Sequence, residues 1–329
     1  MTKRLDQKLR YLVVGGAGYL GSHLVDLLMS EGHEVVILDN FSGNVTTNFT
    51  ENALVIDGSI TNLTTLEELE RLNDISGVFN VAAKKSVSES LLIPLEYEKT
   101  NVEGNQNILN YCGRMGIKNF VFTSSAAVYG EVETSNSINE QEMTNPINPY
   151  GASKRKAEIA IAQFCASYPL KAISLRVFNM VGARKNVFLD KKGENVLPIM
   201  LASLNRSIVF KVNGDDFATI DGTCVRDYVS VHDVANAHLL AMRCLEKEEN
   251  FGNQVINVSS GAGTSVLELI SILNNQTEKP LIWEFTQRRE GDPSSVIGNN
   301  DLAREILGWE PTISIEQSIY ETVTAFEEA

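Results

Sequence analysis

The stretch that decides the fold is VVGGAGYLG, residues 13–21. Its valines end a short apolar run typical of a buried strand, and its last residues begin a helical pattern. Gly15 permits a tight turn, Gly18 lets the backbone approach a pyrophosphate, and Gly21 lets the helix pack closely on the strand. The helix N-terminus offers unpaired N–H groups to phosphates. We therefore predict that residues 13–21 bind the pyrophosphate of a dinucleotide.

The same alternation of strand and helix runs through the first half of the chain. Strand-like runs lie at 11–14, 34–38, 54–56, 78–81 and 120–122, and helical patterns lie between them at 18–30, 63–72 and 95–115. Strands that alternate with helices of about ten or more residues predict βαβ units and a parallel sheet. Right-handed crossovers then give a doubly wound Rossmann sheet, which binds ligands at the carboxyl ends of its strands. We therefore predict an α/β protein.

Asp39 indicates which dinucleotide binds. It ends the second strand-like run, 24 residues past Gly15. A carboxylate at this position accepts hydrogen bonds from the adenosine ribose and repels a 2′-phosphate. No arginine that could pair with such a phosphate follows in residues 40–44. The sequence therefore predicts NAD rather than NADP as the cofactor.

The second half of the chain follows a different pattern. After about residue 180 the loops become rich in Gly, Asn and Asp, although a later strand-like run at 255–258 could rejoin the sheet. We assign residues 1–180 and about 229–258 to an NAD-binding Rossmann domain, and about 181–228 and 259–329 to a smaller, mixed α/β C-terminal lobe for the substrate. Since no flexible linker is apparent, we expect the two parts to pack directly together.

A tyrosine and a lysine at helical spacing, Tyr150 and Lys154, carry the predicted chemistry. Residues four apart share a helix face, so the phenol and the ammonium point into the same space. A free tyrosine has a pKa near ~10, and we expect the ammonium and a positive nicotinamide ring to lower it. Ser125, at the end of the fifth strand-like run, could bind a substrate oxygen and relay its proton, whereas Ser124 is expected to bond loop backbone.

The charge of the chain bears on its partners. With 28 basic and 42 acidic residues, its formal net charge is −14. Such a surface repels nucleic acid and anionic membranes, so we expect neither as a partner. It would also repel a diphosphate, so a nucleotide site must supply its own cations and backbone N–H groups.

Targeting and metal signals are weak. No apolar run approaches the ~18 residues of a membrane span, and the first residues lack the apolar core of a secretory signal. These features predict a cytoplasmic protein. The four cysteines are scattered, with no CxxC pair and no histidine at metal spacing, which predicts free thiols in a reducing compartment and no metal site.

At these residues the chain resembles the UDP-glucose 4-epimerases of the extended short-chain dehydrogenase/reductase superfamily, and the resemblance covers nearly the whole chain. Beyond the glycine turn and the Ser–Tyr–Lys set, the shared stretches are AAKKSVSES (82–90), NVEG (101–104) and RVFNMVGA (176–183). More diagnostic are DGTCVRDY (221–228) and RREGD (288–292). The resemblance implies an isomerase of galactose metabolism that interconverts UDP-glucose and UDP-galactose with bound NAD.

The resemblance also implies the residues of the site. Those expected to bind NAD are Gly15, Gly18, Tyr19, Leu20, Gly21, Asp39, Asn40, Ser42, Asn44, Ser59, Ile60, Val81, Ala82, Ala83, Lys85, Asn101, Tyr150, Lys154 and Phe178. Those expected to bind the UDP-sugar are Lys85, Ser125, Tyr150, Asn179, Asn195, Val196, Arg226, Arg289, Asp292 and Val296. The two arginines would be the cations that the diphosphate requires, although either alone could be a surface ion-pair partner.

Three positions depart from the pattern or choose between sugars. Ser59 stands where the family usually has an aspartate that bonds the adenine amino group, and serine can still accept that bond. Lys84 occupies a usually apolar position, which nothing in the sequence explains. Val296 stands where a tyrosine would close the sugar pocket to a 2-acetamido group, so UDP-GlcNAc and UDP-GalNAc are expected as further substrates. Alternatively, Val296 begins an apolar strand that points into the core.

The implied reaction oxidises and re-reduces C4 of the sugar. Tyr150 removes the proton of the 4-hydroxyl, directly or through Ser125, while NAD takes the hydride and returns it to the opposite face. The nearest alternative, a dehydratase of the same fold, carries an acidic pair where this chain has Ala126 and Ala127. A second alternative, a non-catalytic NAD sensor, typically lacks the Tyr/Lys pair.

The resemblance further implies a homodimer. The helices around 95–115 and 149–168 would join a second subunit. Their apolar faces could equally belong to the internal core.

Overall fold

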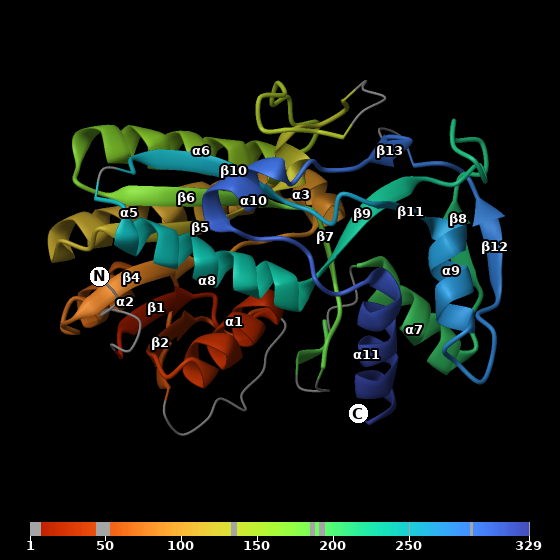
Figure 1. The fold of residues 1–329 in the computed structure, drawn as a ribbon, viewed down its shortest axis with the longest axis horizontal. Coiled ribbons are helices and arrows are strands. Elements are labelled where there is room, and N and C mark those ends of the chain that lie inside the picture. Colours follow the sequence, from red (N-terminus) through yellow and green to blue (C-terminus); the bar gives the residue numbers. More distant parts are fainter. Residues whose placement is uncertain are drawn as a thin grey trace.

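The structure is a computed structural model that describes residues 8–43, 53–132, 137–184, 188–190, 195–249, 251–289 and 292–328. Figure 1 shows two parts lying side by side: a sheet flanked by helices, and a smaller lobe that contains β8, β9, β12 and the C-terminal helix α11. Among the described residues, no helix is both long and apolar enough to cross a membrane. All four cysteines are free, and Cys112 is the buried one.

The large part is built on a seven-stranded sheet in which every pairing is parallel. Its strands are β1 (Arg10–Val14), β2 (Glu34–Asp39), β3 (Leu54–Asp57), β4 (Ile75–Asn80), β5 (Asn119–Ser125), β6 (Lys171–Val177) and β10 (Asn253–Val258), in the order β10-β6-β5-β4-β1-β2-β3. The predicted doubly wound sheet is confirmed. The chain leaves β1 toward β2 and β3 and then crosses to β4 on the other side. Ligands of such sheets bind at this reversal, beyond the carboxyl ends of β1 and β4.

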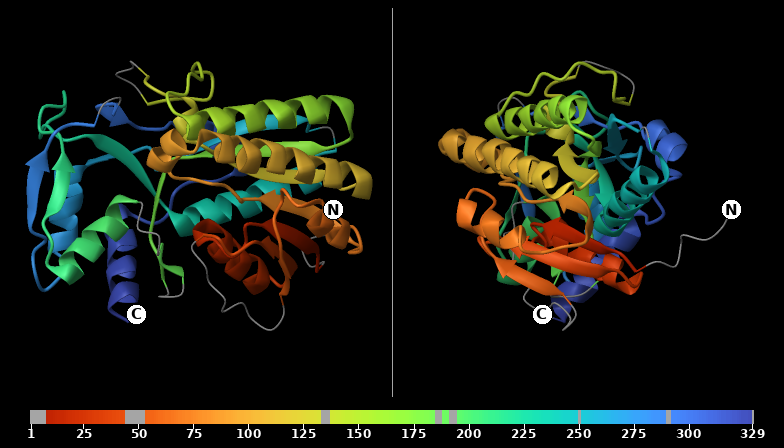
Figure 2. Two further views of the ribbon diagram at one scale, coloured as in Figure 1. Left: turned by 180° about the vertical axis from the view of Figure 1, so that it is seen from behind. Right: turned by 90° about the vertical axis from the view of Figure 1, so that its left-hand side faces the viewer.

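Helices cover both faces of the sheet. Those of the large part are α1 (Tyr19–Ser30), α2 (Leu63–Leu69), α3 (Val87–Leu92), α4 (Pro94–Tyr97), α5 (Gly104–Met115), α6 (Pro149–Ser167), α8 (Val231–Lys247) and α10 (Asp301–Leu307), with a π-helical turn η1 (Glu98–Glu103) and a 3-10 turn η2 (Ala126–Val128). α8 lies in front in Figure 1, whereas α5 and α6 lie in front when the molecule is seen from behind in Figure 2. The inner strands read as continuous apolar runs because both of their faces are buried, whereas the edge strand β3 is mostly exposed.

The alternation of side chains along β1 builds two separate cores. Val13 packs with α1 and α8 on one face of the sheet. Leu12 and Val14 pack with α2, α5 and α6 on the other face. All three side chains are completely buried.

The small lobe has a mixed sheet and its own core. Around β9 (Val225–Ser230) lie β7 (Asn179–Val181) and β13 (Ser295–Val296), both parallel to it, and β11 (Gly263–Ser265), which is antiparallel. A second pair joins β8 (Phe210–Asn213) to β12 (Trp283–Thr286). The helices α7 (Val196–Arg206), α9 (Val266–Asn274) and α11 (Ile315–Glu327) bury a third apolar cluster against these strands. The expected smaller, mixed α/β lobe is therefore present.

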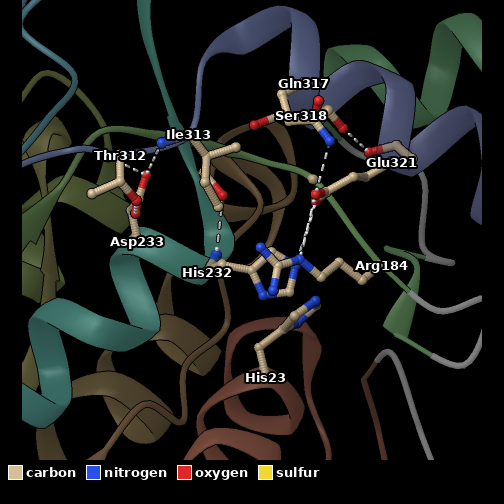
Figure 3. A network of polar contacts seen from close by, with 12 residues as sticks. His23, Arg184, His232, Asp233, Thr312, Ile313, Gln317, Ser318 and Glu321 are labelled. Carbon is tan, nitrogen blue, oxygen red and sulfur yellow. Dashed lines mark hydrogen bonds and ion pairs between the residues drawn. The ribbon is translucent and has the colours of Figure 1, made fainter.

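Two details differ from the sequence-based expectations. The helical pattern at 95–115 is interrupted by the π-helical turn η1. The helix α10 and the buried Trp309, which the sequence division places in the lobe, pack into the core of the large part instead. The Trp309 indole donates to the Asp233 carbonyl, and the Asp233 carboxylate accepts from the backbone of Thr312 and Ile313 (Figure 3). The domain division itself remains a prediction.

Candidate active site

The glycine turn after β1 is shaped for close backbone contact. Gly15 has φ +84°, and a Cβ there would lie 2.7 Å from the Ala82 backbone. A Cβ on Gly21 would collide with the Gly15 carbonyl, whereas one on Gly18 would meet only that carbonyl, at 3.3 Å. The first turn of α1, which begins at Tyr19 and Leu20, has no side-chain cap. A bound diphosphate can therefore approach Gly18 and accept from this helix terminus.

Asp39 ties the second strand to the glycine turn. Its carboxylate accepts from the N–H of Ala17 (2.9 Å) and from the N–H of Phe41 (2.8 Å). Burial raises the pKa of Asp39, and these backbone bonds oppose the rise. Ser42 donates to Asn40 on the exposed loop that follows. The carboxylate is thus placed at the carboxyl edge of the sheet, beside the turn that would hold the pyrophosphate.

Asp39→Ala should narrow the preference for NAD over NADP. NAD affinity should fall roughly tenfold, because the charge-assisted bonds to the ribose are lost, while the 2′-phosphate of NADP is no longer repelled. Direct titration of nucleotide-free protein with both dinucleotides measures the change. Asp39→Asn is the matched control, since it removes the charge but keeps an acceptor for Ala17. Equal affinity of the wild-type chain for NAD and NADP would contradict the assignment.

The remaining cofactor positions follow the ends of β3 and β4. Ser59 is half-buried and bonds Thr61 through its hydroxyl (2.9 Å), and Ile60 is buried. Val81, Ala82 and Ala83 follow β4 directly. Asn44 lies outside the described residues.

Asn101 fixes the backbone of Lys84 in the loop that follows β4. It is buried in η1, accepts from the Lys84 N–H (2.9 Å), and donates to the Lys84 carbonyl (3.0 Å) and the Ser153 hydroxyl (2.9 Å). Both of its amide protons are therefore used within the chain. The Lys84 side chain, unexplained by the sequence, lies 3.7 Å from Glu89 and over the ring of Tyr97.

Lys85 is held by a carboxylate that sequence reasoning missed. Its ammonium binds both oxygens of Asp190, at 3.2 and 3.0 Å, and Asn195 donates to the same carboxylate (2.6 Å). Asn195 is the N-cap of α7 yet makes no capping bond with its side chain. Asp190 thus links a position expected to touch NAD with one expected to touch the substrate. It lies in a loop without periodicity, so no sequence signal could have identified it.

The two hydroxyls that are expected to be catalytic lie where a strand end meets a helix start. Pro149 begins α6, and the Asn148 side chain caps it by accepting from the Gly151 N–H (2.9 Å), which sets Tyr150 in the first turn. Ser125 is the last residue of β5, and its hydroxyl forms a hydrogen bond with that of Tyr150. The structure therefore brings Ser125 and Tyr150 together.

Lys154 lies deeper than the sequence suggests. It is 2% exposed, and its ammonium donates to the Thr123 carbonyl (2.7 Å). Burial lowers the pKa of Lys154 to about 7, and the charge of Glu158 opposes this effect. Burial raises the pKa of Tyr150, opposed by its bond to Ser125. Burial therefore raises the Tyr150 pKa in the chain alone, and the expected lowering of this pKa by Lys154 and the nicotinamide ring stays a prediction for the protein with NAD bound.

Ser124 is also placed differently from the expectation. Its hydroxyl donates to the buried carboxylate of Glu158 (2.5 Å) rather than to loop backbone. The spacing Tyr150, Lys154, Glu158 was a usable signal, since steps of four residues keep side chains on one helix face.

Two of the residues expected to bind the substrate, Arg226 and Arg289, contact a third, Asp292. Its carboxylate accepts from Arg226 Nη2 (2.6 Å), and its N–H donates to the Arg289 carbonyl (3.3 Å). Arg226 is further fixed by donating to the carbonyls of Val225 and Pro293. Arg289 is exposed.

Val296 lies between Arg226 and the residues that follow Ser125. In the parallel pair of β13 and β9, Val296 is the register partner of Arg226. It is partly buried in a cluster that contains Ala126 and Phe178. Asn179 follows Phe178 and is exposed on β7, whereas Val196 is the first residue of α7 and packs on the lobe core.

Comparisons with known proteins agree with this geometry. The family model described as the NAD dependent epimerase/dehydratase family matches residues 11–259. A UDP-glucose 4-epimerase of Corynebacterium glutamicum is 37% identical over 324 residues, which cover 98% of this chain and 96% of that protein.

Two solved structures extend the similarity to the whole fold. A UDP-glucose 4-epimerase from Stenotrophomonas maltophila, with bound NAD and formylated UDP-arabinopyranose, superposes with a TM-score of 0.91 at 32% identity, covering 98% of both chains. A UDP-Glc/GlcNAc 4-epimerase from Campylobacter jejuni gives a TM-score of 0.82 at 29% identity, covering 98% of this chain and 100% of that one.

Proposed function

Because this chain belongs to the family of NAD-dependent epimerases and dehydratases, we propose that it is a UDP-hexose 4-epimerase that interconverts UDP-glucose and UDP-galactose. The observation that carries the proposal is the hydrogen-bonded pair of Ser125 and Tyr150 at the carboxyl edge of the sheet, with Lys154 buried beneath. Ala126 and Ala127 follow Ser125, so no acid stands there to eliminate water, which disfavours a dehydratase.

The cofactor site fits NAD on its own geometry. The uncapped start of α1 and the open face of Gly18 suit a pyrophosphate, and Asp39 suits a ribose without a 2′-phosphate. When bound, NAD supplies a hydride acceptor for C4 and a positive ring that favours the phenolate form of Tyr150.

Side chains of the protein remove the proton of the sugar 4-hydroxyl and later return it. Tyr150 accepts it, directly or through the hydrogen-bonded hydroxyl of Ser125, and returns it to the oxygen once C4 has been reduced from the opposite face. Arg226 and Arg289 hold the diphosphate, so that the sugar can turn between the two half-reactions without leaving. The fixed guanidinium of Arg226 is suited to this because its position is set before the substrate arrives.

Incubation of the purified protein with UDP-galactose, without added NAD, tests the proposal. We expect UDP-glucose as the product, because a cofactor that is re-oxidised in each turnover need not be replenished. Loss of water from the sugar would indicate a dehydratase. Absence of any product from protein that contains NAD would indicate a sensor and refute the proposal.

Replacing either arginine with alanine should raise KM for UDP-sugars. Loss of one charge-assisted contact should cost about 1.5–3 kcal/mol, or roughly tenfold to a hundredfold in KM and in inhibition by UDP. Arg289→Ala is the cleaner variant, because the side chain is exposed. Arg226→Ala should also lower thermal stability, since Arg226 holds two backbone carbonyls. Unchanged UDP affinity in both variants would show that the substrate lobe is misplaced.

We further propose that the chain forms a homodimer through the expected helices around 95–115 and 149–168, together with the adjoining α3. Leu92 and Leu95 are each 81% exposed, and Ile159 on the neighbouring α6 is 42% exposed. Exposed apolar side chains that adjoin one another mark an interaction surface. The cytoplasmic location suggested by the sequence stays a prediction.

Leu92→Glu combined with Leu95→Glu should convert the dimer into a monomer, because two charges would be buried at the interface. Light scattering coupled to gel filtration measures the mass. Ile220→Glu is the control, since Ile220 is a fully exposed apolar residue of the small lobe. A wild-type mass of one chain, or an unchanged dimer in the double variant, would refute this surface.

A further inference from the structure

A buried ion pair lies beneath the catalytic residues. Glu158 of α6 and Arg176 of β6 have side chains that are 7% exposed each. Two parallel hydrogen bonds join them, Nε to Oε1 at 3.0 Å and Nη2 to Oε2 at 2.8 Å. A buried pair is weak evidence for stability, because removing both charges from water is costly. Its position next to Lys154 points to another use.

Glu158 links α6, which carries Tyr150 and Lys154, to β5, which ends at Ser125. Tyr150, Lys154 and Glu158 follow one another at steps of four along α6 and share one face of it. The Ser124 hydroxyl donates to Glu158 Oε1 at 2.5 Å. Since successive side chains of a strand point to opposite sides, Ser124 reaches Glu158 while Ser125 faces Tyr150. The Ser124 bond therefore sets the position of the end of β5 relative to α6.

Glu158 also supplies the negative charge that Lys154 feels. Burial lowers the pKa of Lys154 to about 7, and Glu158 acts in the opposite direction. Arg176 donates two hydrogen bonds to the same carboxylate, which fixes the position of the Glu158 charge.

Among the described residues, the side chains of β5, η2, β6 and α8 for which contacts around Lys154, Glu158 and Arg176 are found carry no further negative charge. Thr123 presents its carbonyl to Lys154, and its hydroxyl bonds His238 (2.8 Å), whose pKa burial lowers to about 4. The ring of Phe122 lies 4.8 Å from the Lys154 ammonium. Tyr129 stacks on the guanidinium of Arg176 at 4.8 Å, and burial raises the pKa of Tyr129 to about 12.

We propose that Glu158 is a positioning residue of the reaction, which keeps Lys154 in its ammonium form and holds Ser125 against Tyr150. Arg176 and Ser124 fix the carboxylate that does so. This inference deepens the proposed function and rests on it for the reaction concerned, but the charge state of Lys154 can be measured without any substrate.

Glu158→Gln separates this role from a merely structural one. Removing the negative charge leaves burial unopposed, so Lys154 should lose its proton at a pH about one unit lower. Nuclear magnetic resonance of ¹³Cε-labelled lysine follows this titration, with Lys154→Arg to assign the signal. The pH at which turnover of UDP-galactose stops rising should move in the same direction. A Lys154 signal that titrates at the wild-type pH in Glu158→Gln would overturn the proposal.

Two further variants are needed. One guards against misfolding of Glu158→Gln, and the other separates the effect of the Glu158 charge on Lys154 from the positioning of Ser125. Glu158→Gln leaves Arg176 buried without its partner, so Glu158→Gln with Arg176→Gln provides a neutral pair, in which the same direction of shift is expected. Ser124→Ala keeps both charges; it should leave the titration unchanged and lower kcat roughly threefold to tenfold at constant KM. Unchanged kcat in Ser124→Ala would refute the positioning of Ser125.

Asp233→Asn is the matched control. It also removes a buried carboxylate, at the start of α8, where Asp233 holds Thr312 and Ile313 (Figure 3). It should lower stability but leave the Lys154 titration unchanged, and a shift as large as that of Glu158→Gln would overturn the specific role of Glu158. If the wild-type protein does not interconvert UDP-glucose and UDP-galactose, the proposed function fails, while the titration still decides the role of Glu158.

Discussion

Tyr150→Phe is expected to lower turnover by about 10²–10⁴-fold, the range for losing a positioned acid–base group, while the fold and NAD binding persist. The hydroxyl that is removed is the one bonded to Ser125. The ring should stay in place, because Tyr97 packs edge-on against it, with centroids 6.4 Å apart. Steady-state turnover of UDP-galactose, with retained NAD measured on the same sample, checks the result.

Tyr168→Phe is the control for this substitution. Tyr168 follows the last turn of the same helix and is 52% exposed, so its hydroxyl can be removed without touching the site. Near-wild-type turnover in Tyr150→Phe would remove Tyr150 from the mechanism.

The pH dependence of wild-type turnover should report the ionisation of Tyr150 and Lys154. Burial raises the pKa of Tyr150, so turnover should increase as rising pH favours the phenolate. Burial lowers the pKa of Lys154 to about 7 in the chain alone, so loss of the ammonium should end the increase near that pH. Because the two groups interact, the limbs report the pair rather than either residue.

Val296→Tyr should abolish activity on UDP-GlcNAc and UDP-GalNAc while sparing UDP-glucose and UDP-galactose. We propose that the small side chain leaves room for a 2-acetamido group, and a phenol ring in the same place would fill that room. Val296 is partly buried beside Ala126 and Phe178, close to the catalytic turn. It is the last residue of the short strand β13 (Ser295–Val296), so the alternative interpretation is right that Val296 belongs to a strand but wrong that it begins one. The two interpretations are therefore compatible, since a strand residue can also line the pocket.

Relative turnover of the four UDP-sugars by the wild-type chain and the variant measures this selectivity. Val296→Ala is the control, since it reduces the packing without adding bulk and should keep the N-acetyl substrates. If the wild-type protein turns over UDP-galactose briskly and shows no reaction with UDP-GalNAc, the assignment of Val296 to the sugar pocket is wrong.

Local pattern was enough to predict the sheet and much of the site. The glycine turn follows a strand, and Asp39 and Ser125 each end one; parallel strands bring their carboxyl ends to one edge, so the proximity of these residues follows from the order of elements alone. The spacing of Tyr150 and Lys154 needed only helical geometry. These features can be predicted because they depend only on short sequence motifs and on the order of the strands and helices.

Contacts between distant residues required the tertiary structure. The pairing of Lys85 with Asp190 spans 105 residues, and no periodic pattern marks either partner. The packing of α10 against the large part likewise arises from Trp309 reaching Asp233, 76 residues earlier. The direction of the Tyr150 pKa could not be predicted either. Ionisation depends on how much protein surrounds the hydroxyl, and that burial is produced by the whole fold rather than by the helix that carries the residue.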